Sequence, residues 1–345
     1  MSILVIGKCR TLKEPHNAGG VIVLFEQLIK SFSKAKVAFE ILDLNNRNYR
    51  FSKLSVVYIF LKIIIRTRKH NLVFFNGTAR EYKYYTFFVT MISKFYNKNI
   101  VLRKFAGNFD EYYLKDCNFL SKKLILSALR KANINYFETQ YLVQFFRQYS
   151  ENCRQFPNTR QSYYSNNLPT GPFKKRFVFI SHIKEEKGIN EILEAITLLP
   201  EEYQIHIYGP IIDSYTPPEK FSEVFISAYK GKLNHNEVQR VLITYSTLLL
   251  PTYHKGEGYP GIIIEALSLG IPIIATPSRG IKEMIEDGVS GFFVKEKDPI
   301  NLRDTILKVN EKNFLMLRKN ALNTFSKFDQ DIVMKRILSE IKSLY

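Results

Sequence analysis

The fold is decided in the second half of the chain by the stretch Glu257-Gly258-Tyr259-Pro260-Gly261-Ile262-Ile263-Ile264-Glu265-Ala266. A predicted strand ending at Leu250 precedes this stretch, which then begins a predicted helix. Seven residues separate its two glutamates, so the first lies in the loop and the second about one turn into the helix. Glycine lets the backbone approach a ligand closely, and the first N–H groups of a helix bind phosphate. A loop acid, a phosphate cradle and a helix acid suit a sugar joined to a nucleotide.

The two glutamates also have a purely structural explanation. Acidic residues near the start of a helix interact favourably with the helix dipole. Taken alone, the pair favours that explanation, and its surroundings decide between the two.

Short apolar runs alternate with helical patterns on both sides of this stretch. Because such alternation is typical of parallel sheets covered on both faces, the two series predict two doubly wound α/β domains. The family resemblance given below implies that the two domains face a cleft. The predicted strands are 3–6, 38–41, 72–75 and 100–102, then 177–180, 205–208, 248–250 and 273–275. The predicted helices are 20–31, 54–68, 80–96 and 119–132, then 188–198, 235–245, 261–269 and 299–309.

A domain boundary is predicted within 157–175, which is rich in Asn, Ser, Pro and Gly. The predicted domains are therefore 1–160 and 161–345; the family resemblance given below implies that the first lies on the acceptor side and that the second binds a nucleotide sugar. A last helix over 330–344 follows Asp329, a suitable N-cap. The pattern leaves open whether this helix packs on its own domain or crosses back to the first.

Composition narrows the class of protein. The chain has 345 residues, 46% of them hydrophobic, which is enough for two cores. No apolar run reaches the roughly 18 residues of a membrane span, and three scattered cysteines are typical of a reducing cytoplasm. The net charge of +18 indicates an anionic partner: nucleic acid, acidic lipid or a phosphorylated substrate.

The sequence resembles the retaining GT-B glycosyltransferases of family 4, a group with an E-x7-E motif, from Gly19 to about Val294. The resemblance rests on an ordered set of short motifs in the second half. They are Tyr229-Lys230-Gly231, Leu250-Pro251-Thr252, Glu257-Gly258-Tyr259-Pro260, Glu265-Ala266, Gly270-Ile271-Pro272-Ile273-Ile274-Ala275-Thr276, Gly280-Ile281, Glu283, Asp287-Gly288 and Gly291.

The resemblance implies roles for the donor-binding residues. Glu257 matches the glutamate beside the donor sugar, and Glu265 matches the glutamate on the ribose hydroxyls. Lys187 matches the lysine on the donor diphosphate, where a cation stabilises the departing nucleotide. The backbone over Gly258, Tyr259, Pro260, Gly261 and Ile262 faces the sugar and phosphates.

One position departs from the family pattern. Family members usually have an arginine a few residues before the lysine that matches Lys187, and this sequence has His182 there. Either His182 binds the diphosphate, another basic residue replaces it, or activity is low; His182 also suits a structural capping role. In the first domain, Gly19 and Gly20 resemble the family's glycine pair near the donor phosphates, although a plain turn explains them too. Asn108 and Asp110 are the acceptor-side candidates, with Asp110 either a catalytic base or a helix N-cap.

The resemblance also implies the partners. They are a UDP- or GDP-sugar donor and a saccharide or lipid-linked acceptor in surface polysaccharide synthesis, with no metal and no cofactor. Helices over 54–65, 80–97 and 120–131 mix aromatic and basic residues, which suits either an acidic membrane surface or core packing with a solvated face. We therefore expect a cytoplasmic protein, peripheral at the inner face of the membrane.

Two other functions remain open. One is a catalytically weak GT-B subunit that scaffolds a partner enzyme. The other is a basic nucleic-acid-binding protein, which is not expected because no binding motif is present. The sequence predicts no oligomeric state.

Overall fold

The computed structural model describes residues 2–11, 20–49, 55–162, 171–212 and 214–345. It divides into two compact units. Unit 1 comprises residues 1–158 together with 334–345, and unit 2 comprises residues 159–333. The structure thus divides the chain two residues before the predicted boundary and places residues 334–345 in unit 1.

Unit 1 contains a six-stranded parallel sheet with the order β2-β1-β3-β4-β5-β6. Its strands are β1 (Ser2–Gly7), β2 (Ala38–Asp43), β3 (Leu72–Gly77), β4 (Asn99–Lys104), β5 (Ile134–Phe137) and β6 (Cys153–Gln155). Its helices are α1 (Gly20–Lys34), η1 (Asn46–Asn48), α2 (Ser55–Lys69), α3 (Ala79–Phe95), α4 (Phe109–Glu111), η2 (Tyr112–Asp116), α5 (Phe119–Lys131) and α6 (Gln140–Arg147).

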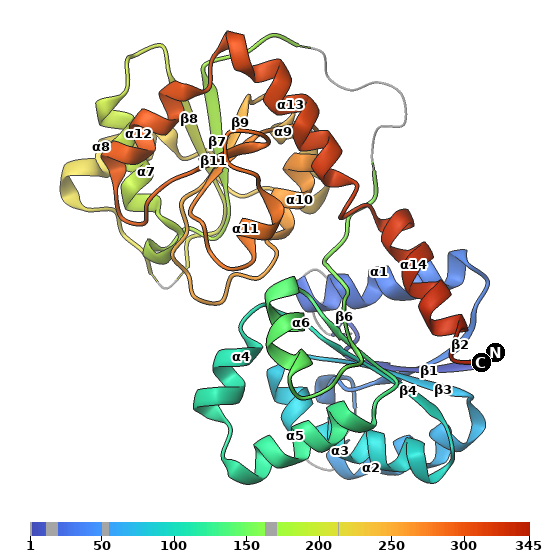
Figure 1. Cartoon of the computed structure of the whole chain (residues 1–345). Helices are drawn as coiled ribbons and strands as arrows, with labels where there is room; N and C mark the ends of the chain where they lie inside the picture. Colours follow the sequence, from blue (N-terminus) through green and yellow to red (C-terminus); the bar gives the residue numbers. More distant parts are fainter. Residues whose placement is uncertain (1, 12–19, 50–54, 163–170, 213) are drawn as a thin grey trace. The chain divides into compact units, whose positions relative to one another are not determined.

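Both faces of this sheet are covered, because successive side chains of each strand point to opposite sides. Val73 and Phe75 of β3 belong to one core cluster with residues of α2, α3, α5 and α6. Phe74 packs on the other face against Phe32 of α1, with ring centroids 6.0 Å apart. Figure 1 shows α1 and α14 on one side of this sheet and α2, α3 and α5 on the other.

Unit 2 contains a five-stranded parallel sheet with the order β11-β10-β9-β7-β8. Its strands are β7 (Arg176–Ile180), β8 (Gln204–Tyr208), β9 (Thr247–Leu250), β10 (Ile273–Ala275) and β11 (Gly291–Phe293). Its helices are η3 (Glu185–Lys187), α7 (Ile189–Leu198), η4 (Glu219–Phe221), α8 (Ser222–Ala228), α9 (His235–Leu242), α10 (Gly261–Ser268), α11 (Ile281–Met284), α12 (Pro299–Lys308) and α13 (Glu311–Phe325).

The helices of unit 2 lie on both faces of its sheet. In Figure 1, α7, α8 and α12 lie on one side, and α9, α10 and α13 lie on the other. Strand β7 has β8 on one edge and β9 on the other, so the chain reverses its winding direction between β7 and β9. Doubly wound sheets bind ligands at such a switch point, outside the carboxyl ends of the strands.

The predicted α/β architecture is confirmed, since all eight predicted strands are present as β1 to β4 and β7 to β10. The sequence missed β5, β6 and β11, which are only three or four residues long, and it missed α6, α8 and α13. Asn135 in the middle of β5 interrupts the apolar pattern. Its buried amide nitrogen donates to the Leu129 carbonyl, at 2.7 Å, and to Ser150 Oγ, at 3.1 Å.

The last helix, α14 (Gln330–Lys342), begins in unit 2 and ends in unit 1. Its buried Ile337 and Ile341 lie on the side that faces unit 1. The Tyr136 hydroxyl donates to Glu340 Oε2 at 2.5 Å, and Asn99 Nδ2 donates to the Leu344 carbonyl at 2.6 Å. These bonds attach the end of the chain to β4 and β5.

In unit 2, the loops that follow β7 and β9 approach each other closely at Gly188. This glycine has φ +76°, and a Cβ there would lie 2.2 Å from the Pro251 carbonyl oxygen. Any larger residue would therefore be strained in its backbone and would also push the two loops apart.

We expect Gly188→Ala to lower the free energy of unfolding by about 2 kcal/mol more than Gly288→Ala does. Gly288 has a similar φ of +72° but open space around its α-carbon, so it isolates the steric clash from the backbone cost. Urea unfolding followed by circular dichroism measures both variants in the same unit. Equal midpoints would show that the loops do not meet as closely as described.

Candidate functional site

The predicted donor residues of unit 2 gather on the loops at the carboxyl ends of β7 and β9. The β7 loop continues through Ser181 to η3, where Lys187 is the last residue before Gly188. The β9 loop runs from Pro251 to Pro260 and contains Glu257. These two loops flank the point at which the winding of the sheet reverses.

Lys187 and Glu257 form an ion pair between Lys187 Nζ and Glu257 Oε1. Both side chains are only 11% exposed. Burial lowers the pKa of Lys187 to about 8, and the charge of Lys184 acts in the same direction while Glu186 raises it. The adjacent Glu257 carboxylate opposes this effect, since a neighbouring negative charge favours the ammonium form. The structure thus brings together two residues that lie 70 positions apart in the sequence.

Backbone contacts hold the two loops together. The Glu186 carbonyl accepts from the Tyr253 N–H at 2.9 Å and from Thr252 Oγ1 at 3.2 Å. The Glu186 carboxylate contacts Lys184 at 2.9 Å and His254 Nδ1 at 2.6 Å. Hydrogen bonds from Lys184 and His254 lower the pKa of the Glu186 carboxyl. These contacts fix the backbone on both sides of the Lys187–Glu257 pair.

The loop after β10 contacts the β9 loop at Gly258. A Cβ at Gly280 would lie 2.0 Å from the Gly258 carbonyl oxygen, so the two backbones touch there. The Tyr259 ring is buried, and its hydroxyl donates to Glu283. Pro260 is the N-cap of α10, and Gly261 and Ile262 are its first two residues, both partly exposed. The predicted backbone cradle therefore forms a rigid turn at the start of a helix.

Glu265 is buried in α10 and forms an ion pair with Arg160. Arg160 Nε donates to Glu265 Oε1 at 2.8 Å, and the two side chains are 15% and 7% exposed. Sequence reasoning missed Arg160, because this residue lies in the predicted linker 105 positions before Glu265 and belongs to no motif. Only the tertiary structure brings it to the site.

The remaining predicted donor residues are His182 in unit 2 and the glycine pair in unit 1. His182 is exposed in the loop after β7. In unit 1, Gly20 is the first residue of α1 and is exposed, and Gly19 lies outside the described residues. Each of these positions follows the carboxyl end of a strand, as the sequence predicted.

Asn108 and Asp110 lie at α4 of unit 1. Asn108 is the N-cap of this short helix, so the N-cap role considered for Asp110 belongs to its neighbour. Asp110 is 2% exposed and accepts a hydrogen bond from the Tyr141 hydroxyl at 3.0 Å. Its role as an acceptor-side base stays a prediction.

Neither a metal cluster nor a membrane helix is found in the described part of the chain. No group of three His, Cys, Asp or Glu side chains there could hold a metal ion. No helix among those residues has both the length and the apolar character needed to cross a bilayer.

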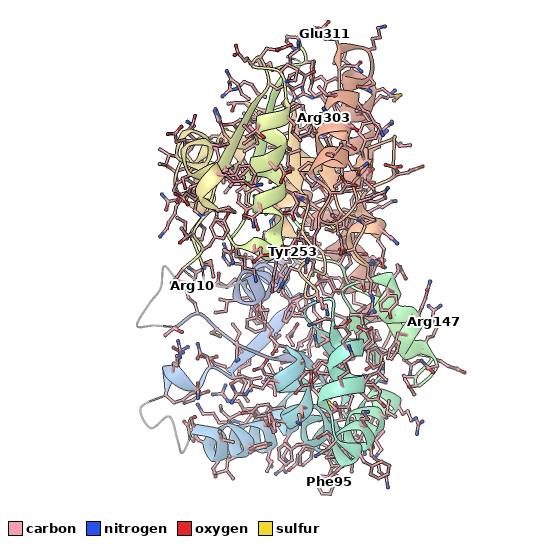
Figure 2. All side chains as sticks on the ribbon, turned by 90° about the vertical axis from the view of Figure 1, so that its left-hand side faces the viewer. Arg10, Phe95, Arg147, Tyr253, Arg303 and Glu311 are labelled. Carbon is pink, nitrogen blue, oxygen red and sulfur yellow. The ribbon has the colours of Figure 1, made fainter. Side chains whose placement is uncertain are left out.

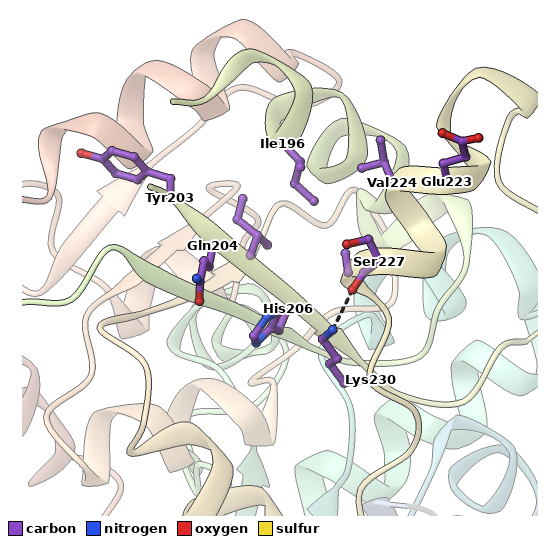
Figure 3. Close-up of a pocket in the computed structure, with 10 residues that line it drawn as sticks. Ile196, Tyr203, Gln204, His206, Glu223, Val224, Ser227 and Lys230 are labelled. Atoms are coloured by element: carbon purple, nitrogen blue, oxygen red, sulfur yellow. Dashed lines mark hydrogen bonds between the residues drawn. The ribbon is translucent and has the colours of Figure 1, made fainter. Parts of the chain in front are cut away.

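A separate pocket of about 530 Å³ opens beside the edge strand β8 (Figure 3). It is lined by Ile196, Tyr203, Gln204, Ile205, His206, Glu223, Val224, Ser227, Ala228 and Lys230. Lys230 Nζ donates to the Ser227 carbonyl at 2.7 Å across its rim. None of the predicted donor residues lines this pocket, so it is distinct from the loops described above.

Two parallel-sheet α/β units joined in this order define the GT-B fold of glycosyltransferases. The chain resembles the crystal structure of Alr3699/HepE of Anabaena in complex with UDP, with a TM-score of 0.74. The match covers 99% of this chain and 100% of that one at 14% identity, so it concerns the fold. Another structure of HepE is a complex with UDP-glucose.

A comparison with protein-family models matches part of the second unit. A family model described as "Glycosyl transferases group 1" matches residues 166–324. This segment contains Lys187, Glu257 and Glu265 and ends within α13.

Two relatives come from bacterial glycan synthesis. The N,N'-diacetylbacillosaminyl-diphospho-undecaprenol alpha-1,3-N-acetylgalactosaminyltransferase of Campylobacter jejuni is 27% identical over 44% of this chain and 40% of its own. The amylovoran biosynthesis glycosyltransferase AmsK of Erwinia amylovora is 26% identical over 39% of this chain and 36% of its own. The chain spans about half the length of other curated relatives that it matches.

Glu257→Gln is expected to lower the pKa of Lys187, because the variant removes the negative charge that neighbours its ammonium group. NMR titration of ¹³C-methylated lysines measures this pKa, and Lys187→Arg identifies the signal by its loss. Glu202→Gln is the matched control, since Glu202 pairs with Lys175 elsewhere in unit 2. An unchanged Lys187 titration in Glu257→Gln would mean that the pair does not form in solution.

Proposed function

We propose that this protein is a retaining glycosyltransferase that transfers a hexose-type sugar from a nucleoside diphosphate to a saccharide or lipid-linked acceptor. The observation that carries the proposal is the Lys187–Glu257 pair at the switch point of the unit 2 sheet, beside the start of α10. A buried cation next to a carboxylate provides one group for a diphosphate and one for a sugar hydroxyl. The match of residues 166–324 to a glycosyltransferase family supports this assignment.

In this proposal each donor residue has one task. Lys187 binds the diphosphate and stabilises the negative charge that grows on it as the glycosidic bond breaks. Glu257 accepts a hydrogen bond from a sugar hydroxyl, and Glu265 accepts from the ribose hydroxyls. The N–H groups at the start of α10 contribute to phosphate binding. His182 is a second, pH-dependent phosphate donor, since its side chain lies exposed on the loop after β7.

The proposed reaction is a front-face displacement. The bond between the anomeric carbon and the diphosphate oxygen breaks, and its electron pair leaves with the diphosphate. The acceptor hydroxyl oxygen forms the new bond on the same face, and its proton passes to the departing phosphate oxygen. The products are a glycoside with retained configuration and a nucleoside diphosphate. The protein cation Lys187 takes the place of a metal ion in this scheme.

The proposed partners follow from the relatives. UDP-sugars are the first donor candidates, because HepE structures are complexes with UDP and UDP-glucose. GDP-sugars are the second. A lipid-linked glycan in surface polysaccharide synthesis is the proposed acceptor, supported by the names of the Campylobacter and Erwinia relatives.

The surface of unit 1 supports a membrane-bound acceptor. Helices α2, α3 and α5 expose large apolar side chains, among them Phe119 at 82%, Phe95 at 77% and Leu120 at 61%. Figure 2 shows Phe95 pointing outward from unit 1. Basic side chains contact other exposed residues of these helices: Lys62 Nζ lies 4.2 Å from the centre of the Tyr58 ring, and Lys131 Nζ lies 3.1 Å from Met91 Sδ. Apolar and aromatic side chains among cations suit the head-group region of an acidic bilayer.

The charge of the chain is concentrated on the same unit. Unit 1 contains 29 lysines and arginines against 11 acidic residues, so its formal net charge is +18. Unit 2 contains 21 of each and is neutral. The proposed membrane surface therefore lies on the unit that carries the positive charge, and the protein is proposed to be peripheral at the cytoplasmic face.

Glu257→Ala is expected to lower turnover about a hundredfold or more, because it removes a contact to the reacting sugar. The assay offers UDP-, GDP- and ADP-sugars with a lipid-linked saccharide and detects the released nucleoside diphosphate. Adding a chelator tests whether the reaction needs a metal. Glu296→Ala is the control, since Glu296 is an exposed glutamate elsewhere in unit 2.

Calorimetric titration of UDP and GDP into the wild-type protein measures nucleotide binding, and this measurement needs no acceptor. Failure to bind either nucleotide would overturn the proposal. Near-normal turnover in Glu257→Ala would remove Glu257 from the mechanism.

Replacing both Phe119 and Leu120 by Ser is expected to weaken binding to acidic lipid vesicles about tenfold or more, since each residue contributes buried apolar area at the interface. Co-sedimentation with phosphatidylglycerol vesicles at low salt measures this binding, and added salt is expected to weaken it further. Replacing both Leu315 and Met316 by Ser is the matched control, because these exposed residues lie on α13 of unit 2. Absence of wild-type binding to acidic vesicles at low salt would contradict the membrane surface.

A further inference from the structure

Arg160 lies where the chain enters unit 2, and its backbone is fixed there by the segment through which the chain leaves. The Arg160 N–H donates to the Phe328 carbonyl at 3.1 Å, and the Arg160 carbonyl accepts from the Gln330 N–H at 2.9 Å. The two segments pair as a short parallel bridge between Arg160 and Asp329. Asp329 in turn accepts from the N–H groups of Asp331 and Ile332 at the start of α14. The side chain of Arg160 therefore extends from a backbone position held on both sides.

That side chain reaches the helix that begins with Gly261. Nε donates to Glu265 Oε1 at 2.8 Å, and Nη1 donates to the Thr159 carbonyl at 3.0 Å. The third nitrogen lies over the first residue of α10, since a Cβ at Gly261 would lie 2.1 Å from Arg160 Nη2. All three guanidinium nitrogens are thus placed by contacts with unit 2.

This geometry fixes the Glu265 carboxylate in one orientation. A planar guanidinium held at several points orients a carboxylate more strictly than a flexible ammonium does. A nearly buried ion pair is weak support for stability, because desolvation offsets much of the attraction between the charges. We explain the Arg160–Glu265 ion pair by the position that it gives to the Glu265 carboxylate, rather than by a contribution to stability.

We infer that Arg160 is a positioning residue that holds Oε1 of Glu265, so that Oε2 is the acceptor for a ribose hydroxyl of the donor nucleotide. This inference rests on the proposed function, in which Glu265 binds the ribose. Arg160 acts through Glu265 and does not itself contact the nucleotide. Its effect is therefore on the choice between ribose and 2′-deoxyribose.

The test compares the binding of UDP and 2′-deoxy-UDP to the full-length protein by calorimetry. A site built to accept from a hydroxyl discriminates against the analogue that lacks it. The wild-type protein is expected to bind UDP more tightly than 2′-deoxy-UDP. Arg160→Gln is expected to reduce this ratio about fivefold or more, since the carboxylate loses a charged hydrogen bond that orients it. Arg160→Lys keeps the charge without the planar fork, so we expect an intermediate ratio.

A double variant separates positioning from direct contact. In the Glu265→Gln background, Arg160→Gln is expected to have no further effect on the ratio, because the group that it positions is already altered. A further loss in that background would show that Arg160 touches the nucleotide and would overturn the inference. Arg303→Gln is the matched control: it removes the same charge from an arginine that pairs with Asp304 on α12 of unit 2.

The outcomes distinguish this inference from the proposed function. An unchanged ratio in Arg160→Gln, with a normal circular dichroism spectrum and normal UDP binding, would overturn the inference and leave the proposed function standing. Absence of UDP and GDP binding in the wild-type protein would overturn the proposed function, and the inference with it. If Arg160→Gln does not fold, Arg160→Lys decides, and a wild-type ratio in that variant overturns the inference.

Discussion

The arrangement of unit 2 depends on the close approach of the loops after β7 and β9. The sheet winds outward from β7 in both directions, so these two loops meet at its carboxyl edge. The approach is possible because Gly188 has no Cβ to collide with the Pro251 carbonyl. Backbone bonds from Thr252 and Tyr253 to Glu186 then keep the loops in register. Without this contact, the two loops would not bring the side chains of Lys187 and Glu257 together.

The ion pairs at this edge share one physical feature. The pairs Lys187–Glu257 and Arg160–Glu265 are nearly buried, and three of these four residues follow the carboxyl ends of β7 and β9: Lys187, Glu257 and Glu265. Buried pairs gain little stability over apolar residues of similar size. Their value is that they present fixed charges in a site with little water, where electrostatic interactions with a charged ligand are strongest. Such a site is suited to a ligand that combines a diphosphate with many hydroxyls.

The two units differ in charge and in the character of their surfaces. Unit 2 is neutral overall, and four charged residues of its β7 and β9 loops form ion pairs: Lys184 with Glu186, and Lys187 with Glu257. Unit 1 holds the whole net charge and exposes aromatic side chains on α3 and α5. One unit is thus suited to bind a small anion specifically, and the other to bind an extended anionic surface. Each unit has its own hydrophobic core, so the charge and surface of one unit can differ from those of the other within a single chain.

The sequence by itself determined the alternation of strands and helices, and it predicted Glu257, Glu265 and Lys187 as donor-binding residues. These features are local: buried parallel strands read as apolar runs, and the glutamates lie in one motif. It missed β5, where Asn135 interrupts the apolar run, and β6, where Arg154 and Gln155 are polar, and it also missed the three-residue strand β11. Only the tertiary structure decided that Arg160 reaches Glu265 and that α14 ends in unit 1. Those contacts join residues more than 100 positions apart, and no local pattern encodes a pairing made by chain reversal.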